Sequence, residues 1–263
     1  MIGVLNLARW EWFKLRRRWM PWILLAILLA FSQLAAWSDL DNQTLPQSLY
    51  QVLSILHTFA LIMLTVLAAS VTGLEYGLGT LRPALARGTG RWQYLAGKLL
   101  LLATVTAATL LLILLVTMAS NLVSLLLGGG PASGGEPQGW LDVLRKFGNA
   151  WFSLMPYLAL VVLVTLVTRS TAAGNAIGIS YFFAEQIVSL ILSALFDWFP
   201  RVTDYLLVSN ITDFTGGLSI NFGEPQEISL LRPGLVLLVY TITLYGLAFW
   251  LFNRRDIGGA SGS

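Results

Sequence analysis

Long apolar stretches without charged residues alternate along this chain with short segments in which the charges gather. A helix crosses the hydrocarbon core of a bilayer with about 20 apolar residues, and six stretches reach that length. They predict membrane-spanning helices at about residues 19–38, 50–73, 97–127, 148–168, 171–196 and 233–252. The pattern therefore predicts an all-α integral membrane protein with six transmembrane helices, and the even number places both termini on the same side.

The composition agrees with this pattern and excludes an ordinary soluble domain. Of the 263 residues, 56% are hydrophobic and 11% are charged, and the mean hydropathy is +0.74. A soluble domain has about a quarter of its residues charged, so lipid must be the solvent for most of this surface. The absence of cysteine excludes disulfides and thiolate metal sites, and a single histidine, His57, excludes a metal site built from histidines.

The distribution of lysine and arginine predicts the orientation. Twelve basic residues lie in the N-terminal segment, the connection after the second span, the turn after the fourth span and the C-terminal tail, whereas four lie on the other side. Because basic residues are enriched in short cytoplasmic loops, we expect both termini in the cytoplasm. The permease domain is expected to cover residues 1–257, and residues 258–263 resemble an appended linker.

The segment of residues 2–18 has the spacing of an amphipathic helix. Leu5, Ala8, Trp12 and Leu15 recur at helical intervals, while most of the basic residues lie elsewhere around the helix. Such a helix lies in the membrane interface before the chain turns into the first span. The alternative is a basic flank that serves only to fix the topology, and the sequence does not separate the two.

The connection between the second and third spans, residues 74–94, is unlike a passive linker. It combines Glu75, a glycine turn at Gly79 and Thr80, a helix-compatible stretch and a second glycine turn before Arg91. A short linker needs only polar and flexible residues, so this composition predicts an ordered element that binds a partner.

The chemistry of an enzyme is missing from the sequence. The glycines at positions 77–97 match neither the phosphate-binding pattern G-x-x-x-x-G-K-[ST] nor G-x-G-x-x-G, so no nucleotide site is expected. No G-x-S-x-G nucleophile motif accompanies His57, which lies near the outer end of the second span. We expect no catalytic residues, no metal, no cofactor bound by this chain and no nucleic-acid partner.

Glu185 is exceptional because it lies in the middle of the fifth predicted span. A carboxylate at bilayer depth is costly and normally faces the helix bundle or a wet cavity. On a helix it shares one stripe with Gly174, Gly178 and Tyr181, and the two glycines form a G-x-x-x-G pattern that permits close helix approach. One interpretation is a carboxylate at the transport pathway or a dimer interface; the other is a packing hydrogen bond to a neighbouring helix.

Three segments together resemble a known family. They are ARWEWFKLRRR before the first span, GLEYGLGTLRPALARGTGRWQYLAGKLL after the second and FNRRDI after the last. This pattern resembles the type-2 permease subunits of ATP-binding-cassette exporters, in which a Glu and a Lys precede the first span, E-x-x-x-G-T-L follows the second and a Lys begins the third. The matching residues are Glu11, Lys14, Glu75, Gly79, Thr80, Leu81, Arg91, Lys98, Arg254, Arg255 and Asp256. The resemblance covers about 60 residues.

The resemblance implies a partner and a mechanism. Two permeases pair, as a homodimer or a paralogous heterodimer, and each binds a cytoplasmic ATPase subunit that holds ATP and Mg²⁺. It assigns coupling to the 74–94 connection, through Glu75, Gly79, Thr80, Arg82, Arg87 and Arg91. It places the N-terminal helix, with Glu11, Trp12 and Lys14, against the ATPase and the membrane lipid. Residues 197–232 resemble the re-entrant element of that family, although a simple interfacial helix fits equally.

The sequence thus favours the membrane subunit of an exporter of a hydrophobic or amphipathic compound or peptide, in the cytoplasmic membrane of a prokaryote. One alternative is a proton-coupled secondary transporter that uses Glu185, against which stands the lack of inverted repeats. Another is a non-transporting membrane anchor or sensor that recruits a cytoplasmic protein through residues 74–94.

Overall fold

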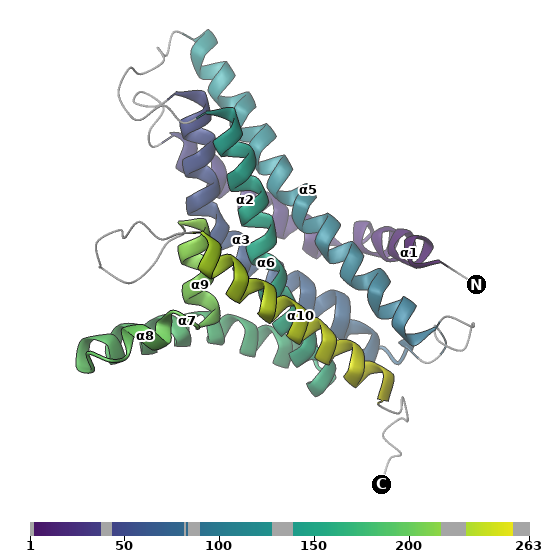
Figure 1. Cartoon of the computed structure of the whole chain (residues 1–263). Coiled ribbons are helices and arrows are strands. Elements are labelled where there is room, and N and C mark those ends of the chain that lie inside the picture. The colour runs from purple at the N-terminus through teal and green to yellow at the C-terminus, as the bar shows by residue number, and fades with distance from the viewer. Residues whose placement is uncertain are drawn as a thin grey trace.

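A computed structural model describes residues 3–37, 44–81, 83, 90–127, 139–216 and 230–254. These residues are almost entirely helical and contain no strand. The helices are α1 (Val4–Arg16), α2 (Trp19–Trp37), α3 (Leu45–Gly77), α5 (Arg91–Leu126), α6 (Trp140–Thr168), α7 (Thr171–Leu195), α8 (Pro200–Thr203), α9 (Leu207–Thr215) and α10 (Leu231–Arg254), labelled in Figure 1. Six of these are long and apolar enough to cross a membrane. The prediction of an all-α membrane protein with six spans is confirmed.

Several helices begin earlier than the apolar stretches predicted. α3 begins at Leu45 instead of residue 50, α5 at Arg91 instead of residue 97, and α6 at Trp140 instead of residue 148. Polar caps are the reason: the Gln47 side chain accepts a hydrogen bond from the backbone N–H of Thr44, and the Gln93 side chain accepts one from Gly90. Hydropathy reports the part of a helix that lies in lipid, whereas a helix of 36 residues such as α5 is about 54 Å long and extends beyond a hydrocarbon core of about 30 Å.

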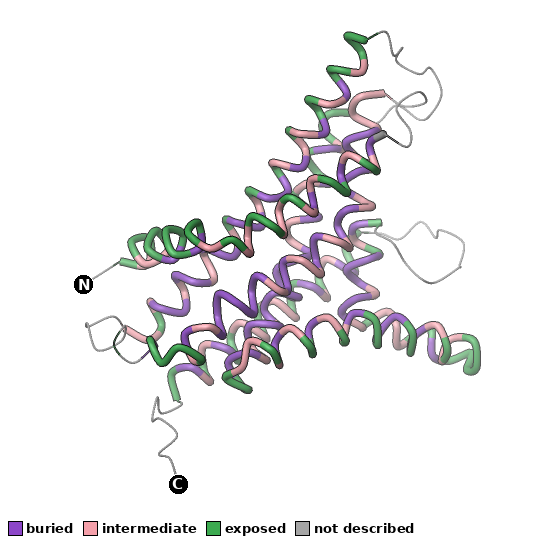
Figure 2. Tube along the Cα trace, turned by 180° about the vertical axis from the view of Figure 1, so that it is seen from behind, coloured by how far each residue is buried: buried purple, intermediate pink, exposed green. Residues whose placement is uncertain are grey.

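The centre of the bundle is formed by α3 and α6. Most residues in the most apolar stretch of each of these two helices are buried, whereas most of those in α2 and α10 are not, and Figure 2 shows buried positions gathering along the middle of the molecule. Tyr157 of α6 is fully buried and donates a hydrogen bond to the backbone carbonyl of Gly178 in α7. The other helices thus pack around a central pair, α3 and α6, whose chains run in the same direction, since Thr65 and Val161 both lie beside Gly178 while Ala69 and Thr165 both lie beside Gly174.

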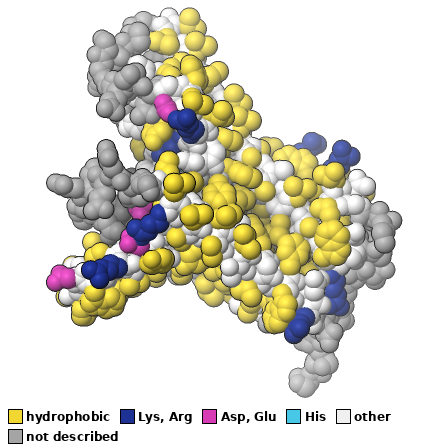
Figure 3. All heavy atoms as spheres, viewed as in Figure 1, with side chains coloured by type: hydrophobic (Ala, Val, Ile, Leu, Met, Phe, Trp, Pro, Cys, Tyr) yellow, Lys and Arg dark blue, Asp and Glu magenta, His cyan; other side chains and the backbone are white. Residues whose placement is uncertain are grey.

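The outer surface is apolar over the middle of the bundle. In Figure 3, hydrophobic side chains cover much of the visible face, while Lys, Arg, Asp and Glu lie toward its two ends. Exposed large apolar residues such as Leu111, Leu115 and Leu122 follow one face of α5. A soluble protein rarely exposes so much contiguous apolar surface, so this distribution agrees with a lipid environment.

The described ends of the chain lie at one end of the bundle. Figure 1 places α1, the end of α3, the start of α5 and the end of α10 on the same side. The Arg91 guanidinium donates a hydrogen bond to the backbone oxygen of Asn253 over 2.9 Å, which joins α5 to α10 there. The arrangement agrees with an even number of spans, and the cytoplasmic location of this end stays a prediction. Arg255 and Asp256 lie outside the described residues.

The predicted N-terminal helix is present as α1 and packs against α5. A Cβ atom added at Gly97 of α5 would lie 2.8 Å from Cβ of Leu7, so the glycine permits this close approach. Glu11 and Leu15 are buried, while Trp12 is exposed. α1 is therefore a packed part of the structure and more than a basic flank, and its place in the membrane interface stays a prediction.

Two short helices, α8 and α9, connect α7 to α10. The Asp204 carboxylate at the end of α8 pairs with Arg232 of α10, and the Tyr240 hydroxyl donates to the backbone oxygen of Tyr205 over 3.0 Å. α9 packs against α6, α7 and α10, with one face buried. The segment of residues 197–232, for which a re-entrant element or an interfacial helix was expected, is helical at α8 and α9. A re-entrant path stays a prediction, and residues 217–229 lie outside the described residues.

Candidate functional site

Four charged side chains meet where α1, α3 and α5 converge. Lys14 Nζ lies 2.6 Å from Glu11 Oε1 and 3.0 Å from Glu75 Oε1. Lys98 Nζ lies 3.1 Å from Glu75 Oε2 and 3.5 Å from Glu11 Oε2. Each carboxylate therefore contacts both ammonium groups, and we call this set the charge network. The two negative and two positive formal charges cancel. The charge network therefore joins α1, α3 and α5 and carries no net charge.

Burial makes this network more than a surface ion pair. The Lys98 side chain is 3% exposed and that of Glu75 is 9% exposed, whereas that of Lys14 is 46% exposed. Lys98 also donates a hydrogen bond of 2.5 Å to the backbone oxygen of Val71. Removing one member of a buried pair leaves an uncompensated charge, so Glu75 and Lys98 depend on one another. Partial burial lowers the pKa of Lys14, but the carboxylates of Glu11 and Glu75 together raise it by more. The pKa of Lys14 therefore lies above its usual value.

The end of α3 explains the spacing between Glu75 and Gly79. Gly79 has φ of +66°, in the left-handed region that favours glycine. Its N–H bonds to the Tyr76 oxygen over 3.3 Å, and the Thr80 N–H bonds to the Glu75 oxygen over 3.1 Å. These two bonds form a Schellman motif, in which the glycine lies four residues after the residue that accepts the outer bond. The motif stops α3 directly after Glu75 has reached the charge network.

The remaining residues predicted for coupling and for the N-terminal helix are spread around this end. Arg91 begins α5 and contacts the end of α10, as described above. Trp12 lines an apolar groove beside the charge network. Arg82 and Arg87 lie outside the described residues. The structure therefore brings together Glu11, Lys14 and Glu75, and their coupling role stays a prediction.

Glu185 lies far from the charge network and contacts the start of α9. Its Oε1 accepts hydrogen bonds from the Ser209 backbone N–H over 2.8 Å and from the Ser209 hydroxyl over 3.4 Å. Ser209 is the third residue of α9, and the first N–H groups of a helix have no partner within it. A carboxylate is favourable there because the helix dipole is positive at its N-terminus. This contact is a hydrogen bond to a neighbouring helix, and a role of Glu185 in transport stays a prediction.

Lys146 of α6 holds the opposite end of α9. The Lys146 side chain, which is buried, donates a hydrogen bond to the backbone oxygen of Thr215, the last residue of α9. Its Nζ also lies 4.4 Å from the centroid of the Tyr50 ring. A cation is favourable at a helix C-terminus. α9 is thus bound at both ends by side chains whose charges match its dipole.

His57 lies beside Lys146 and the end of α9 as a hydrogen-bonded core residue. Its Nε2 lies 2.8 Å from the Ser153 hydroxyl, and its Nδ1 lies 3.5 Å from the Thr215 hydroxyl. These contacts connect α3, α6 and α9. Within the part of the chain that the structure describes, no three His, Asp or Glu side chains gather as a metal site.

The two glycines before Glu185 allow α7 to approach α3 and α6. A Cβ atom added at Gly174 would lie 2.1 Å from Thr165 Oγ1, and one at Gly178 would lie 2.6 Å from Thr65 Cγ2. The glycine stripe is therefore covered within the chain by α3 and α6, and a role of these residues at the pathway or at a dimer interface stays a prediction. Tyr181 follows on the same stripe, with its ring centroid 6.4 Å from that of Tyr157.

From the sequence, Lys98 was named as part of the family pattern but was assigned no role, and Lys146 was missed. They are two of only three lysines in the chain, and the third, Lys14, is also in the charge network. All three contact charged groups, backbone oxygens or aromatic rings inside the protein. The available signal was the choice of residue: this chain uses arginine for most of its basic positions, and its few lysines lie within or beside apolar stretches.

A protein-family model matches the part of the chain that forms the charge network where α1, α3 and α5 converge. The family model of the ABC-2 family transporter protein matches residues 7–185, which include α3, α5, α6 and all four members of the charge network. No curated protein matches the chain. The match covers more than half of the residues, and the six apolar helices agree with a multi-pass membrane protein. The chain therefore belongs to the ABC-2 transporter family and is a permease of an ATP-binding-cassette transporter, whose ATPase lies in a partner subunit.

Proposed function

We propose that this permease works as an exporter subunit in the cytoplasmic membrane of a prokaryote. Two copies, or one copy and a paralogue, form the pathway, and each binds a cytoplasmic ATPase at the end where α1, α3 and α5 meet. ATP and Mg²⁺ belong to the ATPase. The observation that carries the proposal is the buried charge network, because it ties together the helices that flank the predicted coupling connection.

The charge network supports a mechanical role for this end. A partner that pushes on the connection after α3 acts on a unit of three helices, since Glu75 is bound to α1 through Lys14 and to α5 through Lys98. The Tyr94 ring below Lys98 stacks on Phe252 of α10, with centroids 6.1 Å apart. Movement at the connection is thereby passed to four helices, three of which, α3, α5 and α10, are long enough to cross the membrane.

α9 is proposed to cover the outer end of the pathway. It is bound by Glu185 at its start and by Lys146 at its end, and it packs between α6, α7 and α10. Neither contact is covalent, so a rotation of α7 against α6 changes both together. Release of α9 in this way opens the outer end when the ATPases close.

The proposed cargo is a hydrophobic or amphipathic compound or peptide. The apolar surfaces of the helices and the small number of charges between them favour such a cargo over a highly charged one. Glu185 is already bound to α9, which argues against the alternative in which it serves as a proton site for secondary transport.

Co-reconstitution with the ATPase encoded beside the permease tests the proposal. Glu75→Gln and Lys98→Met should lower cargo-stimulated ATPase activity and export at least tenfold, while the two subunits are still inserted in the membrane. Asp142→Asn is the matched control, because Asp142 forms an exposed ion pair with Arg145 at the opposite end of the bundle, over 3.6 Å. Export driven by a pH gradient without any ATPase would overturn the proposal, as would full coupling in both network variants.

A further inference from the structure

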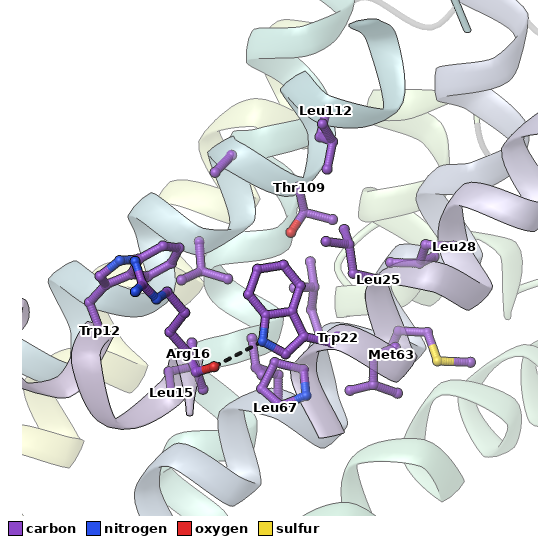
Figure 4. A pocket seen from close by; sticks show the side chains of 15 residues that line it. Trp12, Leu15, Arg16, Trp22, Leu25, Leu28, Met63, Leu67, Thr109 and Leu112 are labelled. Carbon is purple, nitrogen blue, oxygen red and sulfur yellow. Dashed lines mark hydrogen bonds between the residues drawn. The ribbon is translucent and has the colours of Figure 1, made fainter. Parts of the chain in front are cut away.

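An apolar groove lies between α1, α2, α3 and α5, next to the charge network. Its volume is about 230 Å³, and all of its lining side chains are apolar except Arg16 and Thr109. Figure 4 shows Trp12 and Trp22 on one side of it and Leu25, Leu28 and Leu112 around it. The function proposed above does not use this groove.

The groove has an exposed aromatic rim and a buried aliphatic floor. Trp12 and Trp22 are 45% and 50% exposed, whereas Leu28 and Leu67 are 2% and 4% exposed. The Trp22 indole N–H donates a hydrogen bond of 2.9 Å to the backbone oxygen of Arg16, drawn in Figure 4. That bond satisfies the polar atom of the indole and leaves its apolar body for the groove. Tryptophans of this kind are typical of the membrane–water interface.

The depth of the groove matches one leaflet of a bilayer. Leu28 is the tenth residue of α2, which begins at Trp19. Nine steps of about 1.5 Å place it about 14 Å from the start of the helix, close to half of a hydrocarbon core of about 30 Å. The groove therefore extends from the interface to about the midplane, as a single acyl chain does.

Positive charge gathers at the shallow end of the groove. Arg16 lines it, and Arg17 and Arg18 follow in the turn between α1 and α2. Within the described residues, none of these three arginines lies within ion-pair distance of a carboxylate. The nearby Glu11 and Glu75 are both engaged by the lysines of the charge network. The shallow end of the groove is therefore suited to bind an anionic group.

We propose that the groove binds an anionic phospholipid of the adjoining leaflet, with one acyl chain along Leu25 and Leu28 and the phosphate at Arg16. Its volume is below the roughly 300–1,000 Å³ of pockets for drug-sized ligands, which favours a single chain over a bulky cargo. A lipid in this position contacts α1, α2, α3 and α5 at once. It therefore holds α1, which carries Glu11 and Lys14, in place against the bundle.

Photocrosslinking of the full chain in phosphatidylcholine nanodiscs tests this proposal without any transport cycle. The probes are phosphatidylglycerol and phosphatidylcholine that carry the same diazirine on one acyl chain. Phosphatidylglycerol should label peptides of α1 and α2 in preference to phosphatidylcholine. Arg16→Gln should reduce that labelling about fivefold, as expected for about 1 kcal/mol per basic residue at an anionic membrane surface.

Two matched controls separate the groove from the general charge and surface of the protein. Arg9→Gln removes a charge from an exposed position of α1 outside the groove and should leave the labelling unchanged. Ala108→Phe fills the groove from α5 and should remove the labelling, whereas Ala26→Phe, at an exposed position of α2 outside the groove, should not. Circular dichroism and gel filtration establish that each variant is folded.

Three results would overturn the proposal. Equal labelling by the two headgroups, or an equal effect of Arg9→Gln and Arg16→Gln, would mean that Arg16 recognises no phosphate. Labelling that persists in Ala108→Phe would place the chain elsewhere. Displacement of the probe by a compound that the complete transporter exports would assign the groove to the cargo.

Discussion

Lys98 Nζ lies 3.1 Å from Glu75 Oε2, and the two side chains are 3% and 9% exposed. They come from the start of α5 and the end of α3, on either side of the connection that the sequence assigns to coupling. Two opposite charges at that position join the helices and are themselves shielded from solvent.

Loss of Lys98 should destabilise the protein far more than loss of Lys14. Lys98→Met leaves the buried Glu75 carboxylate with Lys14, which is half exposed, as its remaining partner in the charge network. We expect the free energy of unfolding to fall by about 3–5 kcal/mol. Lys14→Met removes a side chain that is 46% exposed, so its cost should be about 1 kcal/mol or less. Thermal unfolding in detergent micelles measures both. Equal effects would contradict the buried network.

The double variant Glu75→Gln/Lys98→Met should be more stable than the sum of the two single variants predicts. Each single change leaves a charge without its partner, whereas the double change removes both. The same unfolding assay completes this double-mutant cycle, and strict additivity would mean that the two side chains do not interact.

The start of α9 should open when Glu185 loses its oxygen. Glu185→Ala leaves the Ser209 N–H without its acceptor, and a charged hydrogen bond is worth about 1.5–3 kcal/mol. Hydrogen exchange of the α9 backbone should then be at least tenfold faster, while Glu185→Gln, which keeps an acceptor, should change it less. Asp213→Asn, at an exposed position of α9, is the control, and an equal rate in Glu185→Ala would disprove the contact.

Added side chains on the glycine stripe of α7 should force the helices apart. Gly174→Ala and Gly178→Ala place a Cβ atom 2.1 Å from Thr165 Oγ1 and 2.6 Å from Thr65 Cγ2. Overpacking of this kind costs about 1–3 kcal/mol. Gly246→Ala is the matched control in α10, because nothing lies within 4 Å of its added Cβ, and it should gain about 0.5–1 kcal/mol. The melting temperatures of the three variants test this prediction. A higher melting temperature for Gly178→Ala would refute the close approach of α7 to α3.

Two glycines at the end of α3 should respond in opposite directions. Gly79→Ala imposes a side chain on a left-handed residue with φ of +66°, at a cost of about 1–2 kcal/mol. Gly77 is the last residue of α3 and has open space around an added Cβ, so Gly77→Ala should gain about 0.5–1 kcal/mol. The two melting curves should therefore move to opposite sides of the parent protein.

Part of the candidate site was predictable from the composition of the connection after α3 and from the family resemblance. The E-x-x-x-G-T segment marked Glu75 and Gly79, and the segment before the first span marked Glu11 and Lys14. That these acids and lysines meet was not predictable, because Glu11 and Lys98 lie 87 positions apart and their contact depends on how α1 crosses α5. The partners of Glu185 were hidden for the same reason, since Ser209 lies in a short amphipathic helix whose path no periodicity reveals.

Length and hydropathy by themselves determined that this chain has six helices that can cross a membrane, because the thickness of the bilayer imposes a local requirement on each one. The charged and capping residues at their ends extended those helices past the apolar stretches. Only the tertiary structure decided which charges neutralise one another, which glycines lie beneath a neighbouring helix and which helices enclose the groove at α2. Those features depend on how helices that are far apart in the sequence are rotated and cross one another. Contacts between the helices set this arrangement, and local sequence preferences do not encode it.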